Sequence, residues 1–361
     1  MTRCSTVVLS ATVLLAASSH AQPTAAPFDL PAGNGADFVR FGTDDFGGGD
    51  AISILPLPID GSTFEIGDAS IAGATDAYDG VFELGVLING VDGFTLADDD
   101  GVLNLIATAE GTRVVLDATA SPVPPSGFSI AAEHFVFANE PLARLLFSIT
   151  NESGQEAMIQ VEMGSDSGTG GTPFDAATAS GDMVVDASDT WIIRTDTSGI
   201  SKIPDPIQIH SYFGEGAPVT PTIVRIDPAD DDDSQVLFDL LVQDGETQSL
   251  IFYIGVADPV APTGLTEAIA LADRLDASGD QLRLDGLLAG IGPATANTVV
   301  NYLIDEPCPA DTNGDGVVSP ADFSAWIDAF NNQLPACDQN GDGQCDPTDF
   351  TAWVANFNNG C

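Results

Sequence analysis

Side chains that carry oxygen recur in two short segments near the C-terminus, offset by 27 residues. Each segment has a side-chain oxygen at positions 1, 3, 5, 9 and 12, a glycine at position 6 and a backbone carbonyl available at position 7. This is the ligand pattern of an EF-hand-type calcium loop. The candidate ligands are Asp311, Asn313, Asp315, Val317, Ser319 and Asp322 in the first loop, and Asp338, Asn340, Asp342, Gln344, Asp346 and Asp349 in the second.

The same residues predict that each loop runs directly into a helix. Ser319 and Asp346 are of the types that cap helix N-termini, and Pro320 and Pro347 follow at the first helical position. Without a cation, the three carboxylates of the first loop and the four of the second repel one another. We therefore expect two bound Ca²⁺ ions, one in each loop, and folding that is coupled to metal binding. The alternative interpretation is two Asx-rich turns that hold no metal.

The two repeats resemble a dockerin module, which is built from two loop-and-helix units with Asp at position 12. The sequences Cys308-Pro309-Ala310-Asp311 and Asn359-Gly360-Cys361 at the ends resemble the cysteine-clasped dockerin-like modules of planctomycete exported proteins. The resemblance implies a protein partner, either cohesin-like or a surface receptor, and polysaccharide breakdown in the best-known systems. Loop positions 10 and 11 help to select a cohesin in well-studied dockerins. Here they are Pro320-Ala321 and Pro347-Thr348 instead of the usual small hydroxyl pairs, which affects the choice of partner and not calcium binding.

Four of the five cysteines fall in this last segment, so three disulfide pairings are possible. The pseudo-twofold arrangement of two such repeats brings the ends of the module together. This favours Cys308 with Cys361 and leaves Cys337 with Cys345. Six aromatic residues also recur there at helical spacing, and we expect them to pack a core, with anchoring of a partner as the alternative. They are Phe323, Trp326, Phe330, Phe350, Trp353 and Phe357.

The overall charge restricts the class of partner. The chain has 361 residues with 9 Lys+Arg and 54 Asp+Glu, which gives a formal net charge of −45. A surface this acidic cannot neutralise a row of phosphates, so we expect no nucleic-acid partner. Hydrophobic residues make up 44% of the chain, which is enough for a large apolar core.

The N-terminus predicts export. Arg3 precedes an apolar run over residues 7–17, and Ser19-His20-Ala21 places small residues at a cleavage site. Residues 1–21 are therefore predicted to be a signal peptide, with a retained signal anchor as the alternative. We expect a mature chain without a membrane span, secreted to the extracellular space or held at the cell surface, where disulfides are stable.

Most of the remaining chain is patterned as short strands. After a Pro/Ala/Gly-rich lead-in at residues 22–35, residues 36–261 alternate short apolar runs with turn residues, which is typical of an antiparallel β-sandwich. Asn89-Gly90 is the clearest hairpin turn. The expected strands cover residues 81–88, 113–116, 129–137, 142–150, 158–163, 191–194, 207–213, 236–242 and 250–256.

Helical spacing replaces the strand pattern after residue 262. We expect a short helical cap over residues 262–305, with helices at 263–275, 280–288 and 294–304. Residues 306–361 form the predicted calcium-binding module. The expected fold class is thus mainly β, an antiparallel β-sandwich with a short helical C-terminal cap, followed by a small α-helical double calcium-loop module.

Catalytic signals in the large domain are weak. The run 164–168 resembles a serine-hydrolase signature, but its central residue is Asp166 and the surroundings of His134 match no catalytic motif. His210 fits a buried position on a strand. The acidic runs at 98–100 and 230–233 are expected to be solvated turns. Carboxylates in or near strands would be the first catalytic candidates, and they are Glu133, Glu162 and Asp196.

The leading hypothesis is an exported, non-catalytic β-sandwich protein that is docked to an extracellular or cell-surface partner through its calcium-binding module. The alternative is a secreted polysaccharide-active component, either an O-glycosyl hydrolase or a carbohydrate-binding subunit, for which a glycan is the further partner. A third hypothesis is a structural surface-layer component, which predicts self-association that depends on calcium.

Overall fold

The computed structural model describes residues 29–41, 66–74, 77–78, 80–95, 103–116, 124–167, 173–196, 205–227, 233–277, 279–304, 309–313, 318–340 and 344–359. The predicted signal peptide, both acidic runs except Asp233, and the pair Cys308 and Cys361 lie outside these residues.

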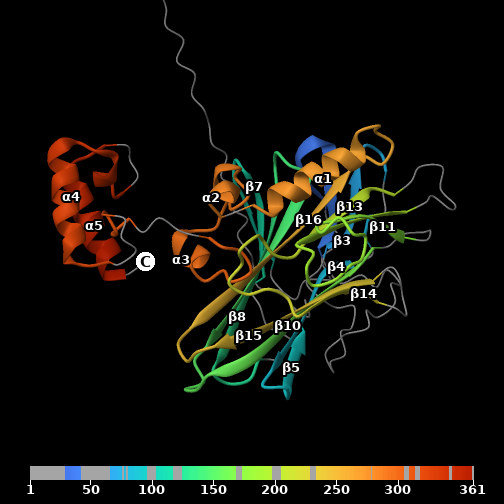
Figure 1. Cartoon of the computed structure of the whole chain (residues 1–361), viewed down its shortest axis with the longest axis horizontal. Coiled ribbons are helices and arrows are strands. Elements are labelled where there is room, and N and C mark those ends of the chain that lie inside the picture. Colours follow the sequence, from blue (N-terminus) through green and yellow to red (C-terminus); the bar gives the residue numbers. More distant parts are fainter. Residues whose placement is uncertain are drawn as a thin grey trace, which may run out of the picture.

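Two antiparallel sheets form the body of the molecule (Figure 1). The first sheet has the strand order β1-β2-β3-β4-β10-β15-β14, and β5 pairs with β4. A short 3₁₀ turn, η1 (Gly33–Gly35), connects the first two strands. The strands are β1 (Asp29–Pro31), β2 (Ala36–Phe41), β3 (Ile66–Ile71), β4 (Gly80–Ile88), β5 (Asp92–Thr95), β10 (Ala157–Asp166), β14 (Ile223–Ile226) and β15 (Asp233–Val242). The first sheet therefore begins within the segment that the sequence marks only as a lead-in.

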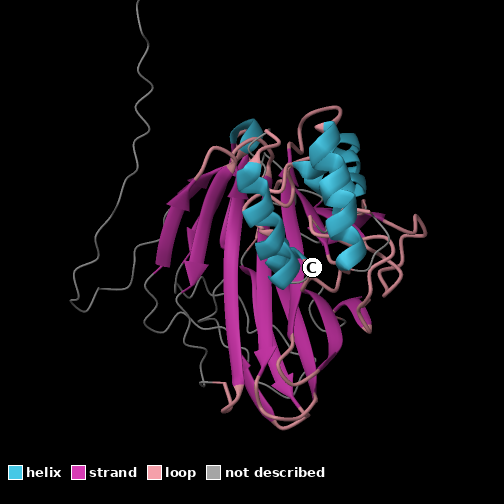
Figure 2. Cartoon of the chain, turned by 90° about the vertical axis from the view of Figure 1, so that its left-hand side faces the viewer, coloured by secondary structure: helices cyan, strands magenta, loops and turns pink. Residues whose placement is uncertain are grey.

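The second sheet has the order β11-β12-β13-β16-β9-β8-β7-β6. Its long strands run side by side in Figure 2. The strands are β6 (Leu103–Ala107), β7 (Gly111–Leu116), β8 (Phe128–Phe137), β9 (Leu142–Asn151), β11 (Pro173–Thr178), β12 (Trp191–Asp196), β13 (Ile207–Ser211) and β16 (Thr247–Ala257). The predicted mainly β, antiparallel architecture is confirmed.

The main apolar core lies between the two sheets. Phe238 on β15 and Phe252 on β16 meet edge to face across it, with ring centroids 5.8 Å apart. Alternate residues of β9, such as Leu145 and Phe147, enter this core, whereas Leu146 joins a second core on the opposite face of the same sheet. The second sheet is therefore buried on both faces, which explains its nearly continuous apolar strands.

The predicted hairpin turn is present between β4 and β5. Asn89 has φ of 51° and Gly90 has φ of 71°. These left-handed conformations suit the pair, because glycine has no Cβ and asparagine tolerates the region better than most residues. The turn sets the register in which Ile88 opposes Asp92.

A helical layer covers the outer face of the second sheet. It contains α1 (Gly264–Leu275), α2 (Gly279–Leu284) and α3 (Pro293–Ala296). Buried residues of α1 such as Ala268 and Leu275 pack with Ile251 of β16 in the second core. The apolar stripe that predicts α1 is therefore the side that faces the sheet.

The last predicted helix of this cap, at residues 294–304, is wrong. Only α3 is helical, and the chain then runs beside β16, where Val299 forms a parallel bridge with Ser249. The side chain of Asn301 accepts from the Ile251 N–H at 2.9 Å and donates to the Ile251 carbonyl. Bonding to the sheet thus replaces helical bonding, and β-branched residues such as Val299 and Val300 favour that extended conformation. The predicted helix at 280–288 also ends early, at Leu284.

Two longer helices follow near the C-terminus, and Figure 1 draws them as an adjacent pair. They are α4 (Pro320–Asn332) and α5 (Pro347–Asn359), with the 3₁₀ turn η2 (Pro335–Cys337) between them. Trp326 and Trp353 are each 5% exposed, so the core-packing interpretation of these two aromatics is confirmed. Among the described residues, no helix is long and apolar enough to cross a membrane.

Candidate metal centre

The two C-terminal loops are closed by the same hydrogen bond. In the first repeat, Oδ1 of Asp322 accepts from the backbone N–H of Asn313 at 3.1 Å. In the second repeat, Oδ1 of Asp349 accepts from the backbone N–H of Asn340 at 3.2 Å. These residues occupy loop positions 12 and 3 in both cases. The carboxylate that ends each loop therefore lies against the segment that begins it.

The same two carboxylates start the helices. Oδ2 of Asp322 accepts from the N–H of Ser319 at 2.8 Å, and Oδ2 of Asp349 accepts from the N–H of Asp346 at 2.8 Å. In the first repeat, Ser319 completes a capping box by accepting from the N–H of Ala321. Loop closure and helix initiation thus depend on one side chain in each repeat.

These contacts favour the charged form of the carboxylates. Burial by itself raises the pKa of Asp322, but the N–H groups of Ser319 and Asn313 outweigh this effect and lower the pKa from its ordinary value. The hydroxyl and the N–H of Thr348 likewise lower the pKa of Asp346. Both side chains are consequently anionic oxygen donors at neutral pH.

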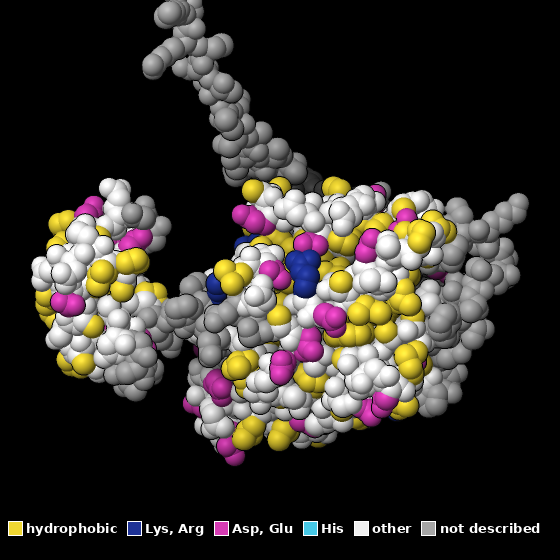
Figure 3. All heavy atoms as spheres, turned by 45° about the horizontal axis from the view of Figure 1, so that its top comes forward, with side chains coloured by type: hydrophobic (Ala, Val, Ile, Leu, Met, Phe, Trp, Pro, Cys, Tyr) yellow, Lys and Arg dark blue, Asp and Glu magenta, His cyan; other side chains and the backbone are white. Residues whose placement is uncertain are grey.

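No side chain in this segment can neutralise that charge. Residues 306–361 contain nine Asp and Glu and no Lys, Arg or His. Asp322 and Asp349 are both fully buried. Figure 3 shows no basic side chain on the visible face of the helical pair. Backbone N–H groups bond both oxygens of each carboxylate, but no basic side chain of this segment offsets their charge. Buried carboxylates are normally paired with a cation or coordinate a metal.

The two repeats also brace each other. Nε1 of Trp326 on α4 donates to the carbonyl of Cys337 at 3.1 Å, directly before the second loop. Nε1 of Trp353 on α5 donates to Oγ1 of Thr312 at 3.2 Å, in the first loop. Ring contacts across the pair, such as Phe323 with Trp353 at 5.0 Å, fill the space between the helices. Each helix therefore supports the loop of the other repeat.

A disulfide joins Cys337 and Cys345, whose Cα atoms are 5.6 Å apart. This confirms one of the two predicted pairs. Because Cys337 directly precedes loop position 1 and Cys345 is position 8, the disulfide spans the first part of the second loop.

The candidate ligand residues that the structure describes have the donor types that calcium takes. Carboxylates, amide oxygens and backbone carbonyls are the hard donors that Ca²⁺ prefers, and the position-12 carboxylate of each loop is already turned back toward position 3. Bound Ca²⁺ would supply the positive charge that the segment lacks. Nine of the twelve predicted ligand residues are described, and Asp315, Val317 and Asp342 lie outside the described residues.

The catalytic candidates of the β-sandwich do not converge. Glu133 on β8 forms ion pairs with Arg113 and, at 3.7 Å, with Arg144, so it is committed to a salt-bridge network. Glu162 is a buried residue of β10 in the other sheet. The side chain of Asp196, at the end of β12, lies outside the described set.

The two buried histidines lie on strands and not in a cleft. His134 packs its ring 5.3 Å from that of Phe82 inside the sandwich. His210 on β13 has a pKa lowered to about 3, first by burial and then by the charge of Arg194. The predicted buried strand position of His210 is confirmed. Ser165, in the hydrolase-like run, is itself buried within β10.

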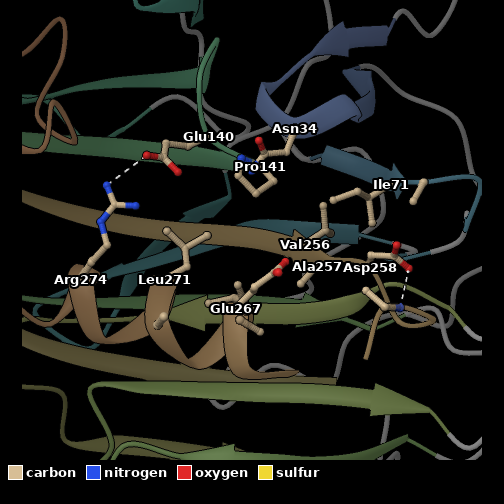
Figure 4. Close-up of a pocket in the computed structure, with 15 residues that line it drawn as sticks. Asn34, Ile71, Glu140, Pro141, Val256, Ala257, Asp258, Glu267, Leu271 and Arg274 are labelled. Atoms are coloured by element: carbon tan, nitrogen blue, oxygen red, sulfur yellow. Dashed lines mark hydrogen bonds and ion pairs between the residues drawn. The ribbon is translucent and has the colours of Figure 1, made fainter. Parts of the chain in front are cut away.

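A pocket of about 560 Å³ lies between α1 and the edge of the sandwich (Figure 4). Its charged side chains are engaged with the protein. Arg274 donates to Glu140 at 3.0 Å, and Glu267 accepts from the hydroxyl of Thr263 at 2.7 Å. Asp258 accepts from the N–H of Val260 at 2.9 Å. No pattern in the sequence indicates this pocket, because its lining comes from segments far apart in the chain.

Comparisons with known proteins do not assign a family. No family model matches the chain, and no curated protein matches its sequence. An α-galactosidase from Geobacillus stearothermophilus is 13% identical over 70% of this chain and 42% of its own, with a TM-score of 0.34. The present chain thus spans less than half of that enzyme.

Two other solved structures are similarly distant. A putative aldose 1-epimerase from Klebsiella pneumoniae is 8% identical over 59% of this chain and 77% of its own, with a TM-score of 0.35. The Slr1438 protein from Synechocystis is 12% identical over 67% of this chain and 99% of its own, with a TM-score of 0.33. Likeness at this level supports no argument about function.

Proposed function

We propose that this chain is an exported, non-catalytic β-sandwich protein that is docked to an extracellular or cell-surface partner through a dockerin-like module binding two Ca²⁺ ions. The observation that supports it most is the matching bond from loop position 12 to position 3 in both repeats. Two unrelated Asx-rich turns have no reason to repeat the same closing bond between positions 12 and 3.

The charge of the segment supports the same function. Two fully buried carboxylates, Asp322 and Asp349, stand in a segment without any basic side chain. Calcium supplies the missing charge, and the coordinated loops then hold α4 and α5 in fixed positions. The module presents apolar side chains to a partner, since Ile327 is 41% and Phe350 44% exposed. The disulfide between Cys337 and Cys345 suits an exported protein, because such bonds persist in oxidising compartments.

The first test is calorimetric titration of the full chain with calcium. We expect two sites in the wild type and loss of both in the double variant Asp322→Asn/Asp349→Asn. Asn removes the charge and keeps one acceptor oxygen, which can serve either the closing bond or the helix-starting bond of its repeat but not both. Far-UV circular dichroism of the variant in chelator therefore checks that a loss of binding is not a loss of folding. Absence of binding heat in the wild type would overturn the proposal.

The second test concerns docking. The purified chain is incubated with the envelope fraction of the producing cell, with calcium or with a chelator, and the bound fraction is measured. We expect retention that depends on calcium and is lost in the double variant. Equal retention of both proteins would contradict docking through the loops and leave calcium binding intact.

The alternative function, a secreted polysaccharide-active component, would use the pocket beside α1. Its carboxylates Glu140, Asp258 and Glu267 are the acid and base candidates there. Release of reducing sugar from a panel of polysaccharides, lost in Glu267→Gln, would favour this alternative over the non-catalytic proposal.

A further inference from the structure

The two loops differ in one structural respect. The second loop is closed by the disulfide between Cys337 and Cys345, which occupy the position before the loop and loop position 8. The equivalent residues of the first repeat are Ala310 and Val318. Ala310 is fully buried, so that pair of positions is apolar in the first repeat and covalent in the second.

The disulfide encloses the early ligand residues of the second loop. Asp338, Asn340 and Gln344, at positions 1, 3 and 7, all lie between the two cysteines in the sequence. Asp346 at position 9 follows Cys345 directly. The bond therefore holds the residue before loop position 1 close to loop position 8, whether or not an ion is bound.

Main-chain contacts hold both ends of this ring. The carbonyl of Cys337 accepts from Trp326, and the carbonyl of Cys345 accepts from Nε2 of Gln333 at 3.4 Å, so α4 and its C-cap contact both cysteines. In the first loop, the corresponding indole contact reaches only the side-chain hydroxyl of Thr312. Among the described residues, α4 and its C-cap therefore anchor the main chain at both ends of the ring that the disulfide closes.

We propose that the Cys337–Cys345 disulfide is a positioning clamp that sets the calcium affinity of the second loop, so that this loop binds Ca²⁺ tightly only in its oxidised form. The inference depends on the proposed function, because it assumes that the loops bind calcium. Two physical effects support it.

The first effect is entropic. Closing a short ring removes open conformations that calcium binding would otherwise have to exclude. The second effect is electrostatic. The second loop brings together more carboxylates than the first, and an unclamped loop can relieve their repulsion by opening. Both effects raise the free energy needed to close the reduced loop around an ion.

The matched variant gives the second loop the residues of the first. Cys337→Ala together with Cys345→Val reproduces Ala310 and Val318 at the same positions and leaves the predicted pair Cys308 and Cys361 unchanged. In calcium titration of the full chain, we expect one site to weaken by roughly tenfold or more and the other to stay within about twofold.

The outcomes distinguish the two proposals. Two sites of unchanged affinity in the variant would overturn the clamp and leave the calcium-binding function standing. Binding by neither the wild type nor the variant would overturn the function itself.

A second measurement uses the wild type alone and so does not depend on the folding of a variant. Dithiothreitol passes two electrons and two protons to the disulfide, closes to its own cyclic disulfide and leaves thiols on Cys337 and Cys345. Because linkage is reciprocal, calcium must protect the bond by the same factor by which the bond raises calcium affinity. Alkylation and peptide mapping over a dithiothreitol series should show a midpoint shifted by roughly tenfold between calcium and chelator. An unshifted midpoint would overturn the clamp.

Discussion

The sandwich and the C-terminal helical pair achieve order in different ways. The sandwich buries apolar side chains on both faces of its second sheet and joins its strands by long antiparallel ladders. The helical pair has a small aromatic core around Trp326 and Trp353 and two buried carboxylates without a basic partner. A region too small for a large apolar core needs further stabilisation. Here the disulfide between Cys337 and Cys345 is one source, and a bound ion is the second that we propose.

The largest expected effect belongs to the sandwich. Arg144 is fully buried on β9 and donates to the carbonyls of Leu287 and Ala289, both at 2.9 Å. Arg144→Met removes one donor from each carbonyl, although the Leu287 carbonyl still accepts from the hydroxyl of Tyr253 at 3.0 Å. It also removes one of the two positive charges that lie against Glu133. We expect a loss of about 3–5 kcal/mol in the free energy of unfolding, measured in urea by far-UV circular dichroism.

Arg274→Met is the matched control. Arg274 forms ion pairs with Glu140 and Asp285, but its side chain is 37% exposed. We therefore expect the free energy of unfolding to change by only about 0–1 kcal/mol. The loss at Arg144 should also be the same with calcium and with chelator. Dependence of that loss on calcium would show that the two regions are not independent.

The second effect belongs to the helical pair. Calorimetric scans of the whole chain should show a transition of the helical pair that calcium raises, while the transition of the sandwich stays fixed. At a free calcium concentration about 10 times the dissociation constant, the stabilisation is about 1.4 kcal/mol for each site. A single unfolding transition whose midpoint shifts with calcium would show that the helical pair and the sandwich unfold together, which would contradict this prediction.

The third prediction uses acid to separate the regions. The pKa of His210 is about 3 in the folded sandwich against an ordinary value of 6.5, so the unfolded chain binds the proton first. Stability is therefore retained above about pH 6.5 and falls by about 1.4 kcal/mol per pH unit as pH drops toward 3. His210→Gln should remove this contribution from the urea-derived stability of the sandwich. If the stability of the wild type and of His210→Gln fell equally with decreasing pH, His210 would not be the group responsible.

The smallest effect concerns helix capping. In chelator, Asp322→Ala should destabilise the helical pair by about 1 kcal/mol, because the capping box of α4 is lost. Asp328→Ala, on the exposed side of the same helix, is the control and should change little. With calcium present, only the effect of Asp322→Ala should increase. If both variants destabilised the helical pair equally in calcium, Asp322 would have no special role in capping or in binding the ion.

Local patterns in the sequence were sufficient for some features. Asn89-Gly90 marks its turn because few residue pairs accept those dihedral angles. The candidate calcium ligands are recognisable because the ligand spacing of such a loop is local in the sequence and does not depend on distant residues.

Features set by distant partners could not be predicted. Nothing near Arg144 indicates that residues 287 and 289 will accept its hydrogen bonds. The segment around Val299 has weak helical spacing, but pairing with Ser249 determines its conformation. The pocket beside α1 could not be predicted from the sequence either, because Glu140 and Arg274 are far apart in the chain and come into contact only on folding.

The reciprocal indole bonds have a consequence for how such a segment can be inherited. Trp326 supports the loop of the second repeat and Trp353 supports that of the first, so neither repeat retains its contacts when the other is deleted. The smallest piece that can be gained, lost or moved between genes as a working part is therefore the pair, although the motif itself is a single repeat.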